Sequence, residues 1–114
     1  MSTLLDNLRR QCDGPRDGAL LRYSLGSALL DTGDAAGAVA AFERALEFDS
    51  TYSAAWKLLG KARLAAGAPA AAADAWRRGI AAASARGDKQ AEKEMTVFLR
   101  RLEKSSAPGD AAQP

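Results

Sequence analysis

The sequence predicts an all-α fold in which pairs of helices repeat and stack into a solenoid. Small and apolar residues recur 34 positions apart between residues 19–52 and 53–86, as Gly26 and Gly60 illustrate. A period of this length is typical of a helix–turn–helix repeat. Alanine supplies much of the 47% hydrophobic content, whereas the chain has only two Trp, two Tyr and three Phe. Such a composition favours helix over strand.

The length and charge of the chain limit its classes of function. Its 114 residues suffice for one domain with a modest core. The net charge of +2 is too small to indicate nucleic-acid binding, and the basic residues form no run interleaved with aromatics. No stretch approaches the roughly 18 apolar residues of a membrane span, and the first ten residues do not resemble a signal peptide. We therefore expect a cytoplasmic protein without nucleic-acid or membrane partners.

The residue types also argue against catalysis. Cys12 is the one cysteine and histidine is absent, so an internal disulfide, a structural zinc site and a histidine-activated nucleophile are excluded. A single cysteine fits a reducing compartment. The acidic residues are spread along helix exteriors rather than paired, and the glycines interrupt helices without forming a phosphate-binding loop. We predict no metal, no cofactor and no catalytic residue, so the protein is not expected to be an enzyme.

The first element is a short helix over residues 3–12. Its apolar stripe at helical spacing consists of Leu4, Leu5, Leu8 and Cys12. Gly14 and Pro15 follow and interrupt it. We expect Cys12 to be buried as a small hydrophobic side chain.

The next helix, over residues 17–31, has two neighbouring stripes. One consists of Leu21, Leu25, Ala28 and Leu29, and the other of Leu20, Tyr23, Ser27 and Leu30. Two stripes indicate a helix that is contacted on two sides, or on one side with a ligand surface on the other. Gly33 supplies a left-handed residue after this helix, and Asp34 can cap the next one, over residues 35–48.

The second pair repeats this plan. A helix over residues 52–66 packs through Trp56, Leu59 and Ala62. Lys57, Lys61 and Leu64 take the positions that Tyr23, Ser27 and Leu30 hold in the first pair. The following helix, over residues 69–86, begins at Pro69, where a missing N–H costs nothing. Its Gly79 replaces an alanine, so we expect a close helix contact there.

The last helix is expected over residues 89–104, after a second glycine–aspartate pair at Gly87 and Asp88. Its apolar stripe is Ala91, Met95, Phe98 and Leu102, with charged residues elsewhere. An amphipathic helix of this kind can cover the open face of the last repeat. We expect a single domain over residues 1–104, with the last helix as a cap over residues 88–104. Residues 105–114 are small, polar and Pro/Gly-containing, so we expect a disordered tail.

The repeated residues resemble the tetratricopeptide repeat (TPR) family. The second unit matches through Trp56, Leu59, Gly60, Ala72 and Trp76, and the first through Leu25, Gly26, Ala38, Phe42, Ala45 and Leu46. The sequence departs from the pattern at Arg22 in the first Trp position, at Leu29 and Arg63 in the Tyr positions, and at Ser50 and Ser84 in place of the closing Pro. The chain is also similar to small bacterial proteins with two repeats. The resemblance implies a right-handed helical-repeat solenoid with a short N-terminal helix and a C-terminal capping helix.

The resemblance implies that the first helix of each pair lines a concave groove. Carried onto this chain, the candidate partner-binding residues are Leu20, Tyr23, Ser27, Leu30, Lys57, Lys61 and Leu64. Ala54 joins them, and the last helix adds Ala91, Met95, Phe98 and Leu102. The leading hypothesis is a non-catalytic protein–protein interaction module, or scaffold, that binds a peptide or helix of a partner. Lys57 and Lys61 favour an acidic or C-terminal partner segment, although the Lys and Asn clamp of some family members is not matched.

Several alternatives stay open at this point. Tyr23 and Leu30 can equally belong to the core or pack against the helix over residues 3–12. That helix can close the end of the array or lie in the groove. Lys57 and Lys61 can be ordinary solvated side chains. The alternative function is a homo-oligomerising structural protein, because short solenoids have exposed ends that can stack on a copy.

Overall fold

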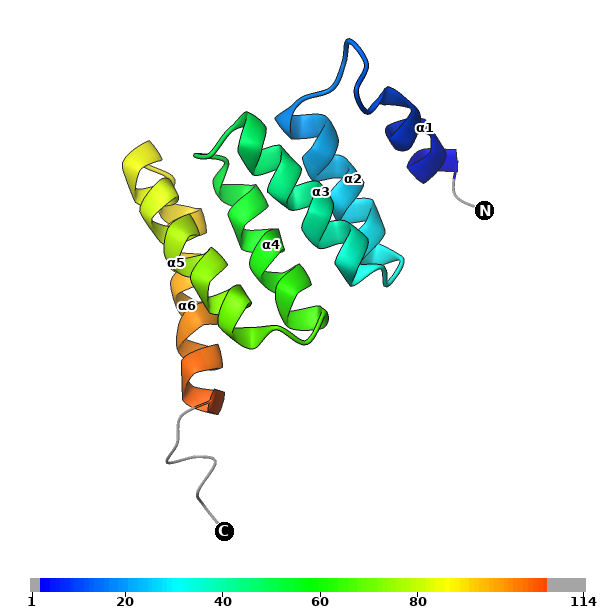
Figure 1. Cartoon of the computed structure of the whole chain (residues 1–114). Coiled ribbons are helices and arrows are strands. Elements are labelled where there is room, and N and C mark those ends of the chain that lie inside the picture. The colour runs from blue at the N-terminus through cyan, green and yellow to red at the C-terminus, as the bar shows by residue number, and fades with distance from the viewer. Residues whose placement is uncertain (1–2, 107–114) are drawn as a thin grey trace.

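The computed structural model describes residues 3–106, which form six α-helices (Figure 1). They are α1 (Thr3–Gln11), α2 (Ala19–Asp31), α3 (Ala35–Phe48), α4 (Ser53–Ala65), α5 (Pro69–Arg86) and α6 (Lys89–Ser106). The described residues contain no strand, so the predicted all-α solenoid is confirmed. The expected disordered tail lies almost entirely outside the described residues, and α6 continues two residues past the expected end at residue 104.

The helices form two layers. Each long helix contacts the next one along the chain, from α2 with α3 to α5 with α6. In addition, α4 contacts both α2 and α6. Helices α2, α4 and α6 therefore form one layer, on which α3 and α5 pack. In Figure 1, α2 to α5 follow one another across the view and α6 lies behind α5.

Within each pair, an aromatic ring lies directly on a glycine. A Cβ atom on Gly26 would lie 2.6 Å from Cε1 of Phe42, and one on Gly60 would lie 2.1 Å from Nε1 of Trp76. The Trp76 indole N–H also donates to the Lys57 carbonyl at 3.0 Å. These glycines let the second helix of each pair approach until its ring touches the backbone of the first.

The turns between helices use a glycine followed by an aspartate twice. Gly33 and Gly87 have φ angles of 90° and 77°, in the region that glycine adopts most easily. Asp34 then accepts a hydrogen bond from the Gly37 N–H at 2.9 Å, and Asp88 accepts one from Ala91 at 3.1 Å. Both aspartates thus satisfy a free N–H group at the start of a helix, as predicted.

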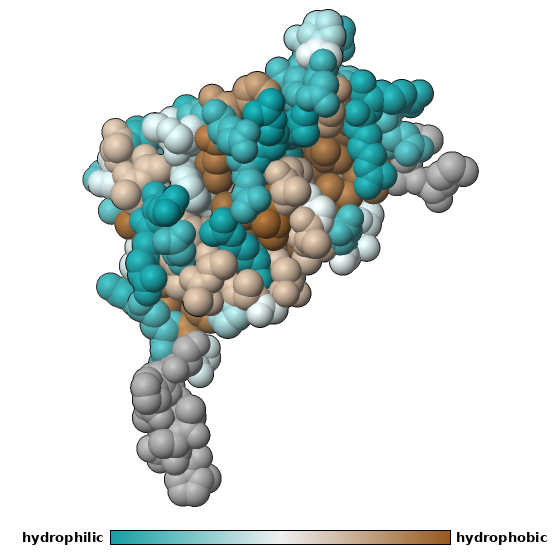
Figure 2. Space-filling view, in the orientation of Figure 1, coloured by the Kyte–Doolittle hydropathy of each residue, from teal (hydrophilic) through white to brown (hydrophobic). Residues whose placement is uncertain are grey.

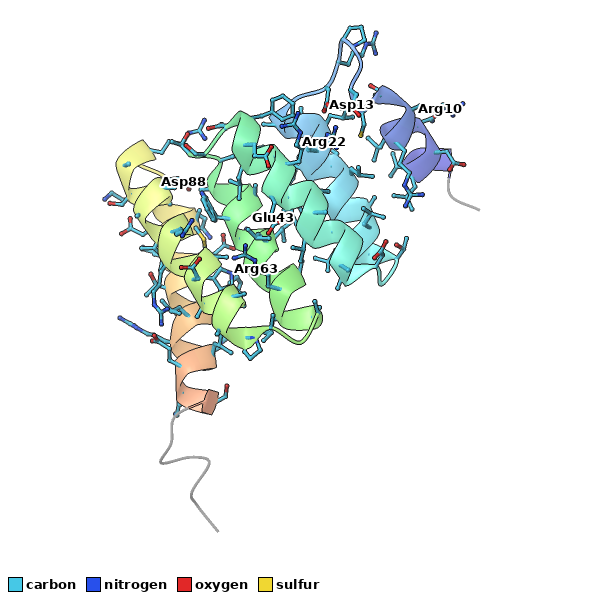
Figure 3. The ribbon with its side chains drawn as sticks, viewed as in Figure 1. Arg10, Asp13, Arg22, Glu43, Arg63 and Asp88 are labelled. Carbon is cyan, nitrogen blue, oxygen red and sulfur yellow. The ribbon has the colours of Figure 1, made fainter. Side chains whose placement is uncertain are left out.

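The two arginines that depart from the family pattern form ion pairs. Arg22 donates to Asp17 at 2.8 Å and to Asp13 at 3.3 Å, which fixes the segment between α1 and α2 (Figure 3). Arg63 of α4 points towards Glu43 of α3, to which it donates at 3.2 Å, and it also donates to the Ala71 carbonyl of α5 at 3.0 Å. Each arginine replaces an aromatic packing contact with hydrogen bonds to neighbouring elements.

Helix α1 closes one end of the array. Leu5, Leu8 and Cys12 pack against the core cluster of the first pair, and α2 is the one described helix that α1 contacts. Of the two positions left open by the sequence, α1 therefore takes the end, and α4 and α6 remain accessible. Cys12 was expected to be buried but is half-buried, with its S–H donating to the Leu8 carbonyl at 3.5 Å.

Helix α6 covers the other end. Met95 is fully buried, with its Sδ atom 2.3 Å from the position of a Cβ atom on Gly79. The close helix contact predicted at Gly79 is therefore confirmed. Phe98 lies beside Trp76 with ring centroids 5.5 Å apart, but it is only half-buried. A second core cluster, centred on Trp76 and Met95, thus joins α5 to α6.

Three aspartates make the stability of the fold sensitive to acid. Hydrogen bonds from Arg22, Thr51 and Ser53 lower the pKa values of Asp17, Asp49 and Asp88, respectively. A lowered pKa in the folded state means that the charged form stabilises the fold at pH values above the unfolded pKa of about 3.9. This stabilisation is lost as the pH falls through the folded-state values.

We therefore expect the melting temperature to fall steadily between about pH 5 and pH 2. Asp88→Asn keeps a side chain that can cap α6 but removes the charge, so its melting temperature should depend less on pH over this range. Thermal unfolding followed by circular dichroism at several pH values tests this. If the melting temperatures of the wild type and Asp88→Asn fall in parallel as the pH is lowered, Asp88 does not contribute to the acid sensitivity.

Candidate functional site

The layer of α2, α4 and α6 presents one continuous surface, which we call the inner face. It is centred on a row of α4 side chains at helical spacing: Ala54, Lys57, Lys61 and Leu64. Leu20 of α2 and the pair Glu94 and Arg101 of α6 flank this row. The exposed fractions of Leu20 and Leu64 are 68% and 43%, so two large hydrophobic side chains are exposed on this face.

A first hollow lies at one end of the inner face, where the N-terminal ends of α2, α4 and α6 come together. It has a volume of about 540 Å³. Its walls are Ala19, Leu20, Asp49, Tyr52, Ser53, Ala54, Arg86, Gly87 and Asp88. The charged groups of this hollow already have partners: Asp49 pairs with Arg86 at 3.4 Å, and Asp88 accepts from the Ser53 hydroxyl at 2.7 Å. In this hollow, Leu20 and Ala54 are therefore the residues available for apolar contact with a partner.

An ion pair crosses the middle of the inner face. Lys57 of α4 lies 3.1 Å from Glu94 of α6, and its side chain is 24% exposed. The sequence predicted Lys57 as a cation that would attract an acidic partner, but Glu94 of the same chain compensates its charge. The reason is the register of α6, which brings Glu94 opposite Lys57.

A second hollow lies at the other end, where α4 and α6 end. It has a volume of about 340 Å³ and is lined by Lys61, Leu64, Trp76, Phe98, Arg101, Leu102 and Ser105. The Lys61 ammonium lies 4.7 Å from the centre of the Phe98 ring, a cation–π distance. We call this hollow, bounded by these seven residues, the α4–α6 cleft. It combines an apolar floor with two basic side chains.

The remaining predicted residues lie deeper in α2. Tyr23 is half-buried, with its ring centroid 5.9 Å from that of Phe42 and 5.1 Å from that of Tyr52. Leu30 is half-buried against the first core cluster, and Ser27 is half-buried as well. Tyr23 and Leu30 thus pack against the core, which was the structural alternative, while each keeps part of its surface exposed.

The sequence did not predict Glu94 and Arg101 as inner-face residues. It placed Ala91 and Met95 on that face, but both are buried. Ala91 and Met95 were expected to line the groove, but they are 6% and 0% exposed because they pack against α5. Glu94 and Arg101 take their place. The signal was in the sequence, since residues 94, 98 and 101 lie on one side of a helix. The charged residues were instead assigned to the solvent-facing side.

The face on the other side of the molecule has a different character. In Figure 1, α6 lies behind α5, so Figure 2 shows the α5 side of the array. Hydrophobic residues are visible there in separate areas between hydrophilic ones. Among the described residues, no helix is long and apolar enough to cross a membrane, and no group of three or more potential ligand side chains is placed to hold a metal ion.

The matches to known proteins agree with this architecture. A family model described as tetratricopeptide repeat matches residues 4–53 and 23–88. The chain belongs to the tetratricopeptide repeat family. The resemblance predicted from the sequence is confirmed, and the first match begins within α1, so it includes the helix that closes the array. TPR proteins generally bind other proteins and are generally non-catalytic scaffolds.

Three known proteins illustrate the relationship. The TPR repeat-containing protein PA0015 of Pseudomonas aeruginosa is 52% identical over 102 residues, which cover 90% of this chain and 97% of that protein. The solution structure of protein BPP2914 from Bordetella parapertussis has a TM-score of 0.83 at 39% identity, covering 99% and 98% of the two chains. The crystal structure of MamA protein has a TM-score of 0.64 at 19% identity, covering 96% of this chain and 68% of that chain, and shares the fold.

Proposed function

We propose that this TPR protein is a non-catalytic interaction module that binds a peptide or helix of a partner protein along its inner face. The observation that carries the proposal is the exposure of Leu20 and Leu64 at the two hollows of that face. When a partner covers apolar side chains that are exposed in a hollow, their removal from water lowers the free energy of the complex. The Lys57–Glu94 pair between the hollows offers polar groups to the partner's backbone.

The alternative function, a homo-oligomerising scaffold, receives less support from the charges at the two ends. On α1 the exposed Arg9 and Arg10 outnumber the exposed Asp6. On the outer side of α6, Lys89, Lys93 and Arg100 outnumber Glu92. Stacking the α1 end of one molecule on the α6 end of another would bring like charges together, which opposes association. Self-association and a cytoplasmic location both remain predictions. Sedimentation velocity at several concentrations tests the first of them.

The proposed function can be tested by site-specific photo-crosslinking in cells. A photoreactive phenylalanine analogue at position 20, 54 or 64 should crosslink to a partner, since these positions lie on the inner face. The same analogue at Ala70 or Ala81, exposed positions on α5, is the matched control. Crosslinked partners identified by mass spectrometry would then be purified and titrated against the wild-type protein.

A discrete crosslinked product from the inner-face positions, absent from the α5 positions, supports the proposal. The titration should also give a weaker affinity for Leu20→Asp and Leu64→Asp, because each puts a charge into an apolar contact. Crosslinks that arise only from Ala70 and Ala81 would move the binding surface to the α3 and α5 side and overturn the proposal.

A further inference from the structure

We propose that the α4–α6 cleft is the anchor point of the inner face and binds an acidic partner segment that inserts one large apolar side chain. This inference rests on the proposed function and specifies both the place and the chemistry of binding. It differs from the expectation based on Lys57 and Lys61, because the second cation is Arg101 of α6 rather than Lys57.

The floor of the cleft is suited to an apolar anchor. The rings of Trp76 and Phe98 pack against one another with centroids 5.5 Å apart, and both line the cleft. Leu64 and Leu102 form its sides, and the side chain of Leu64 is exposed. A volume of about 340 Å³ is at the lower end for ligand pockets, so the cleft suits one leucine or phenylalanine rather than a large cofactor.

The charges at the cleft favour an acidic segment. Helices α2–α5 are described in full, and there every arginine and lysine except Lys61 forms an ion pair with another described residue. Lys61 lies instead over the Phe98 ring, beside the cleft. Arg101 is exposed on the opposite wall and forms no ion pair with a described residue. Two cations that have no ion-pair partner among residues 3–106 therefore flank the apolar floor, and none of the lining residues is acidic.

The first hollow does not offer the same chemistry. Its acidic and basic groups are paired with one another, as Asp49 and Arg86 illustrate. A partner that carries acidic residues would therefore gain attraction at the α4–α6 cleft and not at the first hollow. Charge complementarity thus gives the bound segment a direction along the inner face, with its acidic, apolar part between α4 and α6.

Capped synthetic peptides can test this proposal on the full chain. The first peptide is 14 residues long and carries a leucine and a phenylalanine four positions apart, flanked by glutamates. The second replaces each glutamate with glutamine, and the third replaces the two apolar residues with alanine. Titration followed by two-dimensional NMR should move the indole N–H resonance of Trp76 with the first peptide. Trp56 lies outside the cleft and serves as an internal reference.

Two adjacent arginines provide a matched pair of variants. Arg101 lines the cleft, whereas Arg100 lies on the outer side of α6 near Lys93 and Val97. Both are exposed, so charge reversal at either should leave the fold intact. We expect Arg101→Glu and Lys61→Glu each to weaken binding of the acidic peptide about 10-fold or more at low salt, and Arg100→Glu to change it less than about 2-fold.

The possible results separate the cleft from the rest of the inner face. Equal weakening by Arg100→Glu and Arg101→Glu, or no binding of the acidic peptide, would overturn the proposal. Peptide-induced resonance shifts confined to Leu20 and Ala54 would also overturn it but would leave the proposed function standing.

Deletion of residues 107–114 should not change the affinity for the acidic peptide. A rise of about 10-fold would assign the cleft to the chain's own C-terminal segment, and resonance shifts on concentrating the free protein would assign it to a second copy.

Discussion

Gly60→Ala should destabilise the protein by about 1 to 3 kcal/mol, although alanine is the better helix former. Helix propensity alone predicts a gain of about 1 kcal/mol from this change. The new Cβ atom, however, would lie 2.1 Å from Nε1 of Trp76 and 2.4 Å from Cε2. The indole is rigid, and its N–H donates to the Lys57 carbonyl, so the ring cannot move aside without losing that hydrogen bond. Steric overlap therefore outweighs propensity.

Urea denaturation followed by circular dichroism measures this effect. Gly18→Ala is the control, because a Cβ atom there would meet no atom within 4 Å and the backbone is extended. Its free energy of unfolding should change by less than about 0.5 kcal/mol. Gly26→Ala should behave like Gly60→Ala, since its Cβ would lie 2.6 Å from the Phe42 ring.

A second change tests whether the ring is responsible. Trp76→Leu should be destabilising in the wild-type protein, because it leaves a cavity. In the Gly60→Ala background the same change removes the overlap, so the double variant should lose less stability than the two single losses added together. Strictly additive losses, or a Gly60→Ala variant as stable as the wild type, would show that the contact between ring and backbone is not the constraint.

Most of the fold could be predicted because it depends on local signals that repeat. The spacing between Gly26 and Gly60 fixes the repeat, and large aromatic residues at positions 42 and 76 complete each pair. The helix ends depend on Gly33, Asp34, Gly87 and Asp88, whose roles follow from backbone conformation and capping. These signals need only the residues of one turn or one pair, so the sequence contains them in readable form.

The inner face was harder to predict, because it depends on the register between helices that are distant in sequence. Lys57 and Glu94 are 37 positions apart, and nothing local indicates that they meet. Neighbouring side chains of a helix project about 100° apart, so the orientation of α6 about its axis decides that Glu94 faces α4 while Met95 packs against α5. Similarly, Arg22 and Arg63 could be recognised as departures from the family pattern, but their partners Asp17 and Glu43 become evident only in three dimensions.

Met95→Asp should have the largest effect on stability. Met95 is fully buried where α6 crosses Gly79. A carboxylate there would lose its hydration without gaining a partner, at a cost of several kcal/mol. Since small domains are stabilised by only about 5 to 15 kcal/mol, we expect α6 to detach or the whole domain to unfold. Circular dichroism would report a loss of helix, and hydrogen exchange would show whether the loss is confined to α6.

Val97→Asp is the matched control, because Val97 lies two residues further along the same helix and is 41% exposed. It should melt close to the wild type, whereas Met95→Ala, a milder test of the same site, should lose about 2 to 4 kcal/mol. Similar melting of Met95→Asp and Val97→Asp would mean that α6 does not complete the core. Because Phe98 and Arg101 of α6 both line the α4–α6 cleft, detachment of α6 should also abolish binding of the acidic peptide, while Val97→Asp should retain it.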